Sequence, residues 1–294
     1  MRDAFEYLVC AGCGCVQIAR VPDDLSRYYP PDYYSFAAPR RDGGFRALLQ
    51  RCRAAHLLGR PNPVGWAVVR RYGVPPAIEY VRRAGIRRHH SVLDIGSGSG
   101  ELLLALRSYG FTRLTGVDPY VEEDIDYGNG VRILRRELGA YDGRHDLVML
   151  HHTFEHMDAP LAVLTRVREL LNPGGSVLVR IPVASSEAFE TYGADWVQLD
   201  APRHLYLHTR RSIDLLAREA GLEVNGVVYD STAFQFWGSE QYRRDIPLRD
   251  PRSYRNDPAH SIFSPSDIEA FAARADRLNR EERGDQACFY LGAR

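Results

Sequence analysis

The sequence predicts an α/β fold of the Rossmann type, a doubly wound sheet with helices on both faces. Three observations support this prediction. The apolar run 92–95 is typical of a short buried strand, and the leucine spacing of 101–109 is typical of an amphipathic helix. Glycines alternate in the turn between them, and the next apolar run, 114–117, ends at Asp118.

The glycine turn predicts a site for a nucleoside-bearing cofactor. Gly96, Gly98 and Gly100 let the backbone take positive φ values and let a ligand approach without meeting a Cβ atom. Free N–H groups at the start of the following helix can then meet polar ligand atoms. Asp118 follows at about the offset at which a carboxylate meets ribose hydroxyls in dinucleotide-binding folds. An acidic side chain there selects a ribose without a phosphate.

The glycine spacing distinguishes between cofactors. A nicotinamide fingerprint is G-x-G-x-x-G, whereas this chain has D-x-G-x-G-x-G, beginning at Asp94 inside the strand. This pattern resembles motif I of the class I S-adenosylmethionine-dependent methyltransferases. The resemblance implies that Asp94 lies near the methionine ammonium group and that Asp118 holds the ribose. It also implies a seven-stranded, mostly parallel sheet with an antiparallel last strand.

Further segments resemble the same family, in the same order, as far as Arg294. They are the strand and loop 145–156, the turn 171–175, the strand 177–181, the Asp-Ala-Pro-Arg-His-Leu element 200–205, the helix 210–220, the strand 223–228 and the final strand 287–291. The succession resembles the family branch that holds ubiquinone-biosynthesis-like and sugar-modifying methyltransferases.

The rest of the chain is predicted to form additions to this core. Residues 1–60 are expected to be a zinc-knuckle-like segment and an aromatic arm, and residues 61–294 the methyltransferase domain, with insertions at 182–209 and 231–284. Helices are expected at 46–58, at 76–84 and from Ser264 to near Gly284, with a linker at 61–63. The arm, 21–36, closes over the substrate or packs on the domain. The aromatic stretch 229–242 lines an acceptor pocket or buries a subunit interface.

Candidate cofactor-binding residues lie in the glycine turn or beyond the carboxyl ends of strands, where ligands bind in this fold. Leu138 is included because it follows the third strand, where the family's adenine edge is usually met by backbone groups. The candidates are Asp94, Gly96, Ser97, Gly98, Gly100, Asp118, Pro119, Leu138 and His151.

Candidate catalytic residues are histidines and one glutamate. Transfer to a hydroxyl needs positioning and a base, and histidine serves as a base near neutral pH. His152, Glu155 and His156 match the family's H-x-x-E-H element, and His204 matches the histidine of its Pro-Arg-His-Leu element. Which histidine is the base stays open, and Glu155 either orients a histidine or contacts the substrate. Two further histidines, at 145 and 208, are expected to be solvated.

A metal site is the alternative for two groups of residues. Cys10-x-x-Cys13-Gly14 is a zinc knuckle, but zinc takes four ligands, and Cys52 and His56 could supply the others. The competing interpretation is a hairpin with reduced thiols. Residues 152–156 also spell an inverted zinc-protease pattern, which is disfavoured because a strand runs directly into it.

Composition limits the partners. Basic and acidic residues balance at 38 each and the pI is about 7.2, so no global field favours nucleic acid or an anionic membrane. No apolar run reaches the roughly 18 residues of a membrane span, and the first residues lack the order of a signal peptide. We therefore expect a cytoplasmic protein without nucleic-acid or membrane partners. A homodimer stays open.

The sequence thus predicts an enzyme that moves a methyl group from S-adenosylmethionine to a small molecule. The expected acceptor is a hydroxyl of a sugar, a sugar nucleotide or a phenolic compound. One alternative is a non-catalytic module that binds S-adenosylmethionine. The other is an NAD(P)-dependent oxidoreductase or epimerase, although the usual tyrosine-lysine pair is impossible in a chain without lysine.

Overall fold

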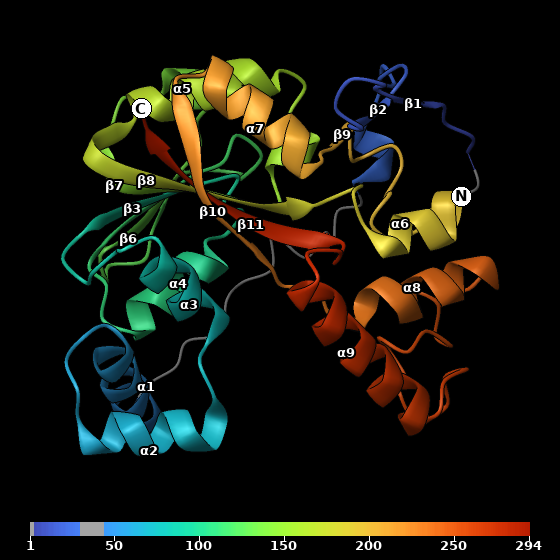
Figure 1. Cartoon of the computed structure of the whole chain (residues 1–294). Helices are drawn as coiled ribbons and strands as arrows, with labels where there is room; N and C mark the ends of the chain where they lie inside the picture. Colours follow the sequence, from blue (N-terminus) through green and yellow to red (C-terminus); the bar gives the residue numbers. More distant parts are fainter. Residues whose placement is uncertain (1–2, 30–43) are drawn as a thin grey trace.

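The computed structural model describes residues 3–29 and 44–294, and an eight-stranded sheet forms its centre (Figure 1). The order is β10-β11-β8-β7-β3-β4-β6-β5. The strands are β3 (Ser91–Ile95), β4 (Arg113–Val117), β5 (Ile125–Asp126), β6 (Val131–Leu134), β7 (His145–His151), β8 (Leu171–Pro182), β10 (Leu222–Tyr229) and β11 (Gln286–Ala293). From β3 the chain proceeds to β4 and β6 on one side and then crosses to β7 and β8 on the other. This order confirms the predicted doubly wound fold.

The edge of the sheet formed by the last strands confirms the predicted antiparallel ending. β11 lies between β8 and β10 and is antiparallel to both, whereas β3 is parallel to β4 and β7. The two-residue β5 pairs antiparallel with β6 at the opposite edge and extends the seven predicted strands to eight.

The predicted turn 171–175 lies within the bounds of β8. His145 pairs with Leu171 and Leu147 with Ser176, so the residues between these pairs loop out of the ladder. Gly174 has a φ of 75°, which favours glycine. The turn is therefore a bulge in a longer strand.

Helices cover both faces of the sheet. Residues of α5 (Pro160–Glu169) and α7 (Arg210–Glu219) join one buried cluster with the strands, and residues of α1 (Phe45–Leu57), α3 (Pro76–Arg83) and α4 (Glu101–Ser108) join the cluster on the other face (Figure 1). The helices α1, α3, α4 and α7 begin and end within one residue of the predicted bounds, whereas no bounds were predicted for α5.

The helix α2 was not predicted. α2 (Pro63–Tyr72) follows the expected linker, and the Asn62 side chain caps it by accepting a hydrogen bond from the Gly65 N–H at 2.7 Å. An Asn-Pro pair at a helix start is a recognised signal. A Cβ on Gly65 would lie 2.3 Å from the carbonyl oxygen of Cys52, so glycine permits the close crossing of α1 and α2.

A second, smaller sheet joins the N-terminal residues to the insertion 182–209. Its order is β1 (Tyr7–Val9), β2 (Val16–Ile18) and β9 (Tyr206–Leu207), all antiparallel, and the short helix η1 (Ser26–Tyr28) follows β2. The insertions contribute α6 (Glu187–Tyr192), η5 (Gly193–Asp195), α8 (Phe234–Arg243) and α9 (Pro265–Arg280).

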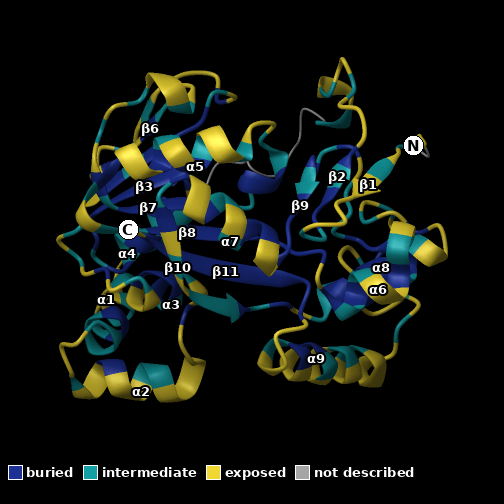
Figure 2. Ribbon diagram, turned by 45° about the horizontal axis from the view of Figure 1, so that its top comes forward, coloured by how far each residue is buried: buried dark blue, intermediate teal, exposed yellow. Residues whose placement is uncertain are grey.

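These additions share a third buried cluster. It contains Val16 of β2, Trp196, Leu207 and Phe236, and Figure 2 shows β2 and β9 on the same side of the molecule as α6, α8 and α9. Phe236 of the aromatic stretch is fully buried there, so this part of the stretch packs within the chain. The predicted boundary between residues 60 and 61 stays a prediction.

In the part of the chain that the structure describes, no helix has the length and apolar character needed to cross a bilayer.

Tyr28 and Tyr29 of the predicted arm lie among the described residues. Tyr33 and Tyr34 of the arm lie outside the described residues.

Candidate active site

The glycine turn lies between β3 and α4. Gly96, Gly98 and Gly100 have φ values of 71°, 51° and 84°. A Cβ on Gly96 would lie 2.3 Å from Cγ2 of Thr153, and one on Gly100 would lie 2.5 Å from Cδ1 of Ile133. The turn therefore needs glycine for its conformation and for space, and Thr153 brings the loop after β7 against it.

Asp118 ties the glycine turn to the end of β4. Its side chain is buried, and its two oxygens accept hydrogen bonds from the backbone N–H groups of Gly98 and Tyr120, each at 2.8 Å. A carboxylate has further lone pairs, which can accept from ribose hydroxyls. The Tyr120 ring itself is exposed.

Asp94 is a buried acid with an unsatisfied oxygen. It is 3% exposed, and its Oδ1 has no hydrogen-bond partner among the described residues. Burial, followed by the charge of Asp118, raises the pKa of Asp94 to about 8. A buried carboxyl without a partner is costly unless a cation joins it. The α-ammonium group of S-adenosylmethionine would be such a cation, so these residues fit that cofactor.

The other predicted cofactor residues lie around the same turn. A Cβ on Gly116 of β4 would lie 2.3 Å from Oγ of Ser97, so this strand glycine makes room for Ser97. Gly116 was not among the predicted residues, although a glycine inside a strand often marks a close approach. Pro119 follows Asp118 and is half-buried. Leu138 begins η3 (Leu138–Ala140) and packs against the sheet core.

His151 lies at the end of β7 and contacts α3. Its ring centroid is 5.4 Å from that of Tyr80, and its Nδ1 is buried without a partner among the described residues. Burial, then the charges of Arg180 and His152, lower its pKa well below the ordinary histidine value. His151 is therefore neutral.

The predicted catalytic residues form one cluster around Glu155. Glu155 lies in η4 (Phe154–His156), is fully buried, and has no hydrogen bond to either oxygen within the described chain. One oxygen is 3.5 Å from Nδ1 of His152 and 3.9 Å from Nε2 of His204. Burial opposes ionisation, but the contact with His152 and the charges of His156 and His204 outweigh it and lower the pKa of Glu155 to about 2.

His156 and His204 present one ring nitrogen each. The Nδ1 atoms lie 2.8 Å from the carbonyl oxygen of Arg203 and 2.7 Å from that of Gln198, respectively. Carbonyl oxygens only accept, so each Nδ1 carries a hydrogen and Nε2 bears the lone pair in the neutral ring. The two rings meet edge to face, 4.7 Å apart. Burial, followed by the charge of His204, lowers the pKa of His156.

Both ring nitrogens of His152 are engaged by side chains. Arg180 of β8 donates from Nη1 to Nε2 of His152, and its Nε donates to Asp230 at 2.7 Å. The Nδ1–H of His152 then faces Glu155. This arrangement leaves His152 without a free lone pair for an acceptor proton. Arg180 and Asp230 were not among the predicted residues. Their signals in the sequence are a charged residue within the predicted strand 177–181 and another just beyond the predicted strand 223–228.

Distant segments meet at this cluster. The backbone N–H of Leu205 in the insertion donates to the carbonyl oxygen of Glu155 at 2.8 Å, and the Tyr29 hydroxyl lies 3.3 Å from Nδ1 of His156. His152 and Asp200 have φ values of 55° and 42°, a left-handed conformation that is uncommon outside glycine and often occurs at functional sites. The insertion 182–209 and the N-terminal arm therefore form part of the wall around this cluster.

One group could hold a metal. Within residues 3–29 and 44–294, the only set of three or more potential ligands close enough together is Glu155, His156 and His204, whose ligand atoms lie within 4.8 Å of one another. The donor set suits a divalent transition metal. The predicted knuckle at Cys10 and Cys13 has no third ligand at that spacing in the described chain.

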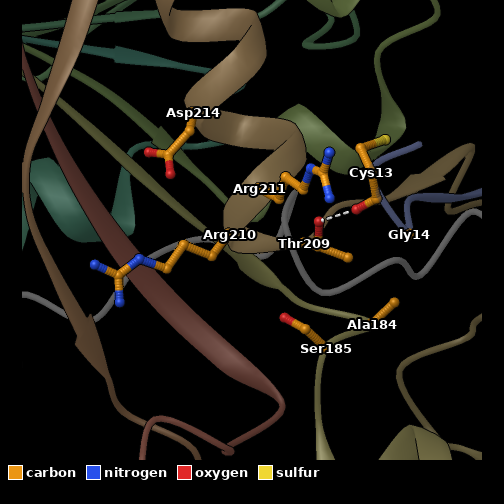
Figure 3. A pocket seen from close by; sticks show the side chains of 8 residues that line it. All are labelled: Cys13, Gly14, Ala184, Ser185, Thr209, Arg210, Arg211 and Asp214. Carbon is orange, nitrogen blue, oxygen red and sulfur yellow. Dashed lines mark hydrogen bonds between the residues drawn. The ribbon is translucent and has the colours of Figure 1, made fainter.

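The predicted knuckle forms the turn between β1 and β2. The carbonyl oxygen of Cys13 accepts from Oγ1 of Thr209 at 2.7 Å, and a pocket of about 520 Å³ lies between this turn and the start of α7 (Figure 3). Of the predicted residues only Cys13 lines this pocket. Cys52 and His56 lie on α1, across the molecule (Figure 1), where they contact Asn62. The structure therefore does not bring them to the knuckle.

The expectation that His145 and His208 are solvated is wrong. They are 6% and 1% exposed, and burial lowers the pKa of each to about 4. His145 contacts the hydroxyl of Tyr141, and His208 stacks between Phe154 and Tyr206. Both are neutral core residues.

The fold, glycine turn and paired carboxylates define an α/β enzyme class that binds a nucleoside-bearing cofactor, and comparison with known proteins identifies the family. Residues 69–227 match a family model described as a methyltransferase domain. The chain is 31% identical over 181 residues to the ubiquinone biosynthesis O-methyltransferase of Cereibacter sphaeroides (strain ATCC 17029 / ATH 2.4.9), covering 53% of this chain and 70% of that one. The corresponding protein of Paraburkholderia xenovorans (strain LB400) is 28% identical over 166 residues, 50% of this chain and 71% of that one.

Among solved structures, the chain is similar to one chain of the complex between the Haloferax volcanii Trm112 methyltransferase activator and the putative methyltransferase. The two are 18% identical, with a TM-score of 0.49, and the match covers 82% of this chain and 96% of that one. The chain belongs to the methyltransferase domain family and is an S-adenosylmethionine-dependent methyltransferase.

Proposed function

We propose that this enzyme methylates a hydroxyl oxygen of a small-molecule acceptor, with His204 as the base. The observation that carries the proposal is the arrangement of His204 and Glu155. Nδ1 of His204 is held by a carbonyl oxygen, and its Nε2 lies 3.9 Å from Glu155 and 3.7 Å from Asp200. Two carboxylates therefore lie beside the ring nitrogen that would take the acceptor's proton.

The other two histidines are less suited to this role. His152 already accepts a hydrogen bond from Arg180 at Nε2. Burial and the neighbouring His204 lower the pKa of His156, so it holds a proton poorly at neutral pH. We therefore assign His152 and His156 as positioning residues that hold Glu155 and the acceptor wall in place.

S-adenosylmethionine, when bound, supplies a methyl group already activated by the sulfonium. The protein must then hold the acceptor oxygen in line and remove its proton. Asp94 and Asp118 would hold the donor at the ends of β3 and β4, and the loop after β7 carries Glu155 beside it. Because Thr153 contacts Gly96, donor site and base cluster are adjacent.

The preferred acceptor is a phenolic hydroxyl, and a sugar hydroxyl is the second candidate. A phenol has a pKa near 10 and gives its proton to a histidine more readily than an alcohol does. The names of the Cereibacter and Paraburkholderia relatives also support transfer to oxygen. A protein that only binds S-adenosylmethionine would have no need of the cluster formed by His152, Glu155, His156 and His204, here called the base cluster.

The test is a panel of phenols and sugars assayed for methylated product by mass spectrometry, followed by variants with the best acceptor. His204→Gln should lower kcat at least a hundredfold, in the range of a lost general base, and leave the affinity for S-adenosylhomocysteine unchanged. His152→Gln should retain more activity, because an amide can still accept from Arg180. Equal activity of His204→Gln and wild type would contradict the base assignment.

Chelation distinguishes a base from a bound metal at the same three side chains. Activity that survives dialysis against EDTA supports His204 acting alone. Activity that is lost, and returns with one divalent metal, would assign Nε2 of His204 to that metal. No methylated product from any acceptor, with S-adenosylhomocysteine bound normally, would support the non-catalytic alternative.

A further inference from the structure

The helical hairpin α1–α2 exposes large apolar side chains. Phe45 and Leu48 of α1 are 74% and 56% exposed, and Trp66 and Tyr72 of α2 are 53% and 66% exposed. Figure 2 shows α2 as a largely exposed helix at the edge of the molecule. Side chains of this size at one edge are typical of an interaction surface.

The same hairpin carries only positive charge. Residues 44–78 contain no aspartate or glutamate and six arginines, at positions 46, 51, 53, 60, 70 and 71. The next acid, Glu79, is paired with Arg82 and Arg83. The chain has 38 residues of each sign, so the rest of the molecule has an excess of acid. The balanced total charge conceals a basic hairpin on an acidic remainder.

The hairpin is a preformed structure. Arg53 is buried, and its guanidinium donates to the carbonyl oxygens of Tyr72 and Gly73, which fixes the end of α2 against α1. Gly65 packs directly against the backbone of Cys52. Docking would therefore require little ordering of the chain.

We propose that the α1–α2 hairpin docks on the surface of an anionic lipid bilayer. Tryptophan, tyrosine and phenylalanine insert at the boundary between head groups and acyl chains, and arginine binds the phosphates. Trp66 and Arg70 show the combination: they are one helical turn apart, with the guanidinium carbon 5.6 Å from the ring centroid. Leu48 and Val64 favour a bilayer over nucleic acid, because exposed aliphatic side chains add nothing to phosphate binding.

This proposal departs from the expectation, drawn from total charge, that the protein has no membrane partner. The acidic remainder would be repelled by the same bilayer, which would orient the hairpin toward it. The hairpin leads directly into α3, whose Tyr80 contacts His151. Docking would place the catalytic site close to the lipid surface.

Vesicle flotation of the full chain tests the proposal. We expect binding to vesicles of phosphatidylcholine mixed with phosphatidylglycerol, weak binding to phosphatidylcholine alone, and weakening with added salt. Trp66→Ser combined with Arg70→Glu should lower the bound fraction at least fivefold, about the effect of one arginine at an anionic surface. Binding of S-adenosylhomocysteine by this variant should stay normal, which separates docking from the donor site.

The matched control is Leu215→Ser combined with Arg218→Glu on α7, where Leu215 is 51% exposed. It should bind vesicles as wild type does. Absence of binding to anionic vesicles at low salt would overturn the proposal, as would an equal loss in the control. Two other outcomes would also overturn the proposal. If the wild type does not bind vesicles but forms a dimer that the hairpin variant loses, the surface belongs to a second copy of the chain. If it binds duplex DNA instead, and the variant does not, the surface belongs to nucleic acid.

Discussion

We predict that the raised pKa of Asp94 makes binding of the donor depend on pH. Burial and Asp118 raise this pKa to about 8, so at about pH 6 only about one carboxyl in a hundred is ionised. An ammonium group beside Asp94 needs the carboxylate, and binding must therefore release its proton. We expect the Kd of S-adenosylhomocysteine to fall up to about tenfold per pH unit between about pH 6 and 7.5, or about 1.4 kcal/mol per unit.

Calorimetry in buffers with different ionisation enthalpies measures both the Kd and the proton released. Asp94→Asn removes the titration and should flatten the pH dependence. The ligand control is 5′-methylthioadenosine, which lacks the ammonium group and should bind wild type with little pH dependence. A wild-type Kd that is constant over this range, with no proton release, would refute the reasoning.

Two substitutions with matched controls test the donor site and the third cluster. Asp118→Ala should weaken the binding of S-adenosylhomocysteine at least tenfold, because hydrogen bonds to an ionised group contribute about 1.5–3 kcal/mol. Asp126→Ala, which removes a similar turn contact at the exposed end of β5, should bind normally, and equal losses would contradict the assignment. Trp196→Phe removes the buried indole N–H that donates to Asp285 at 3.0 Å and should lower the free energy of unfolding by about 1–3 kcal/mol in urea titrations. Trp66→Phe, at an exposed site, should stay within about 0.5 kcal/mol of wild type, and a loss as large as that of Trp196→Phe would count against this account.

The sheet and the geometry of the proposed donor site could be predicted because their determinants are local in sequence. An apolar run, a glycine turn and an aspartate at the end of the next run specify strand, turn and carboxylate within one βαβ unit. The helix α2 had a local signal too, in Asn62 and Pro63, but its short apolar stretch followed a proline-rich segment typical of a linker.

The base cluster could be predicted only in part, because its contacts join residues far apart in sequence. The H-x-x-E-H element placed His152 and Glu155 together, but nothing local indicates that Arg180 engages His152. The burial of His208 has the same origin. Histidine is often at the surface, and contacts distant in sequence enclose this one, among them the ring of Phe154 and the thiol of Cys15.

Family membership constrains the proposed donor half of the site more strongly than the proposed acceptor half. The donor half lies within the matched residues 69–227, whereas the acceptor wall also uses Tyr29, which precedes them. The Tyr7 hydroxyl, also from the N-terminal segment, donates to the carbonyl oxygen of His204 at 2.9 Å. A relative with the same core but another N-terminal segment would keep the donor site and lose these contacts. Acceptor choice should accordingly vary with the N-terminal segment, while the donor stays the same.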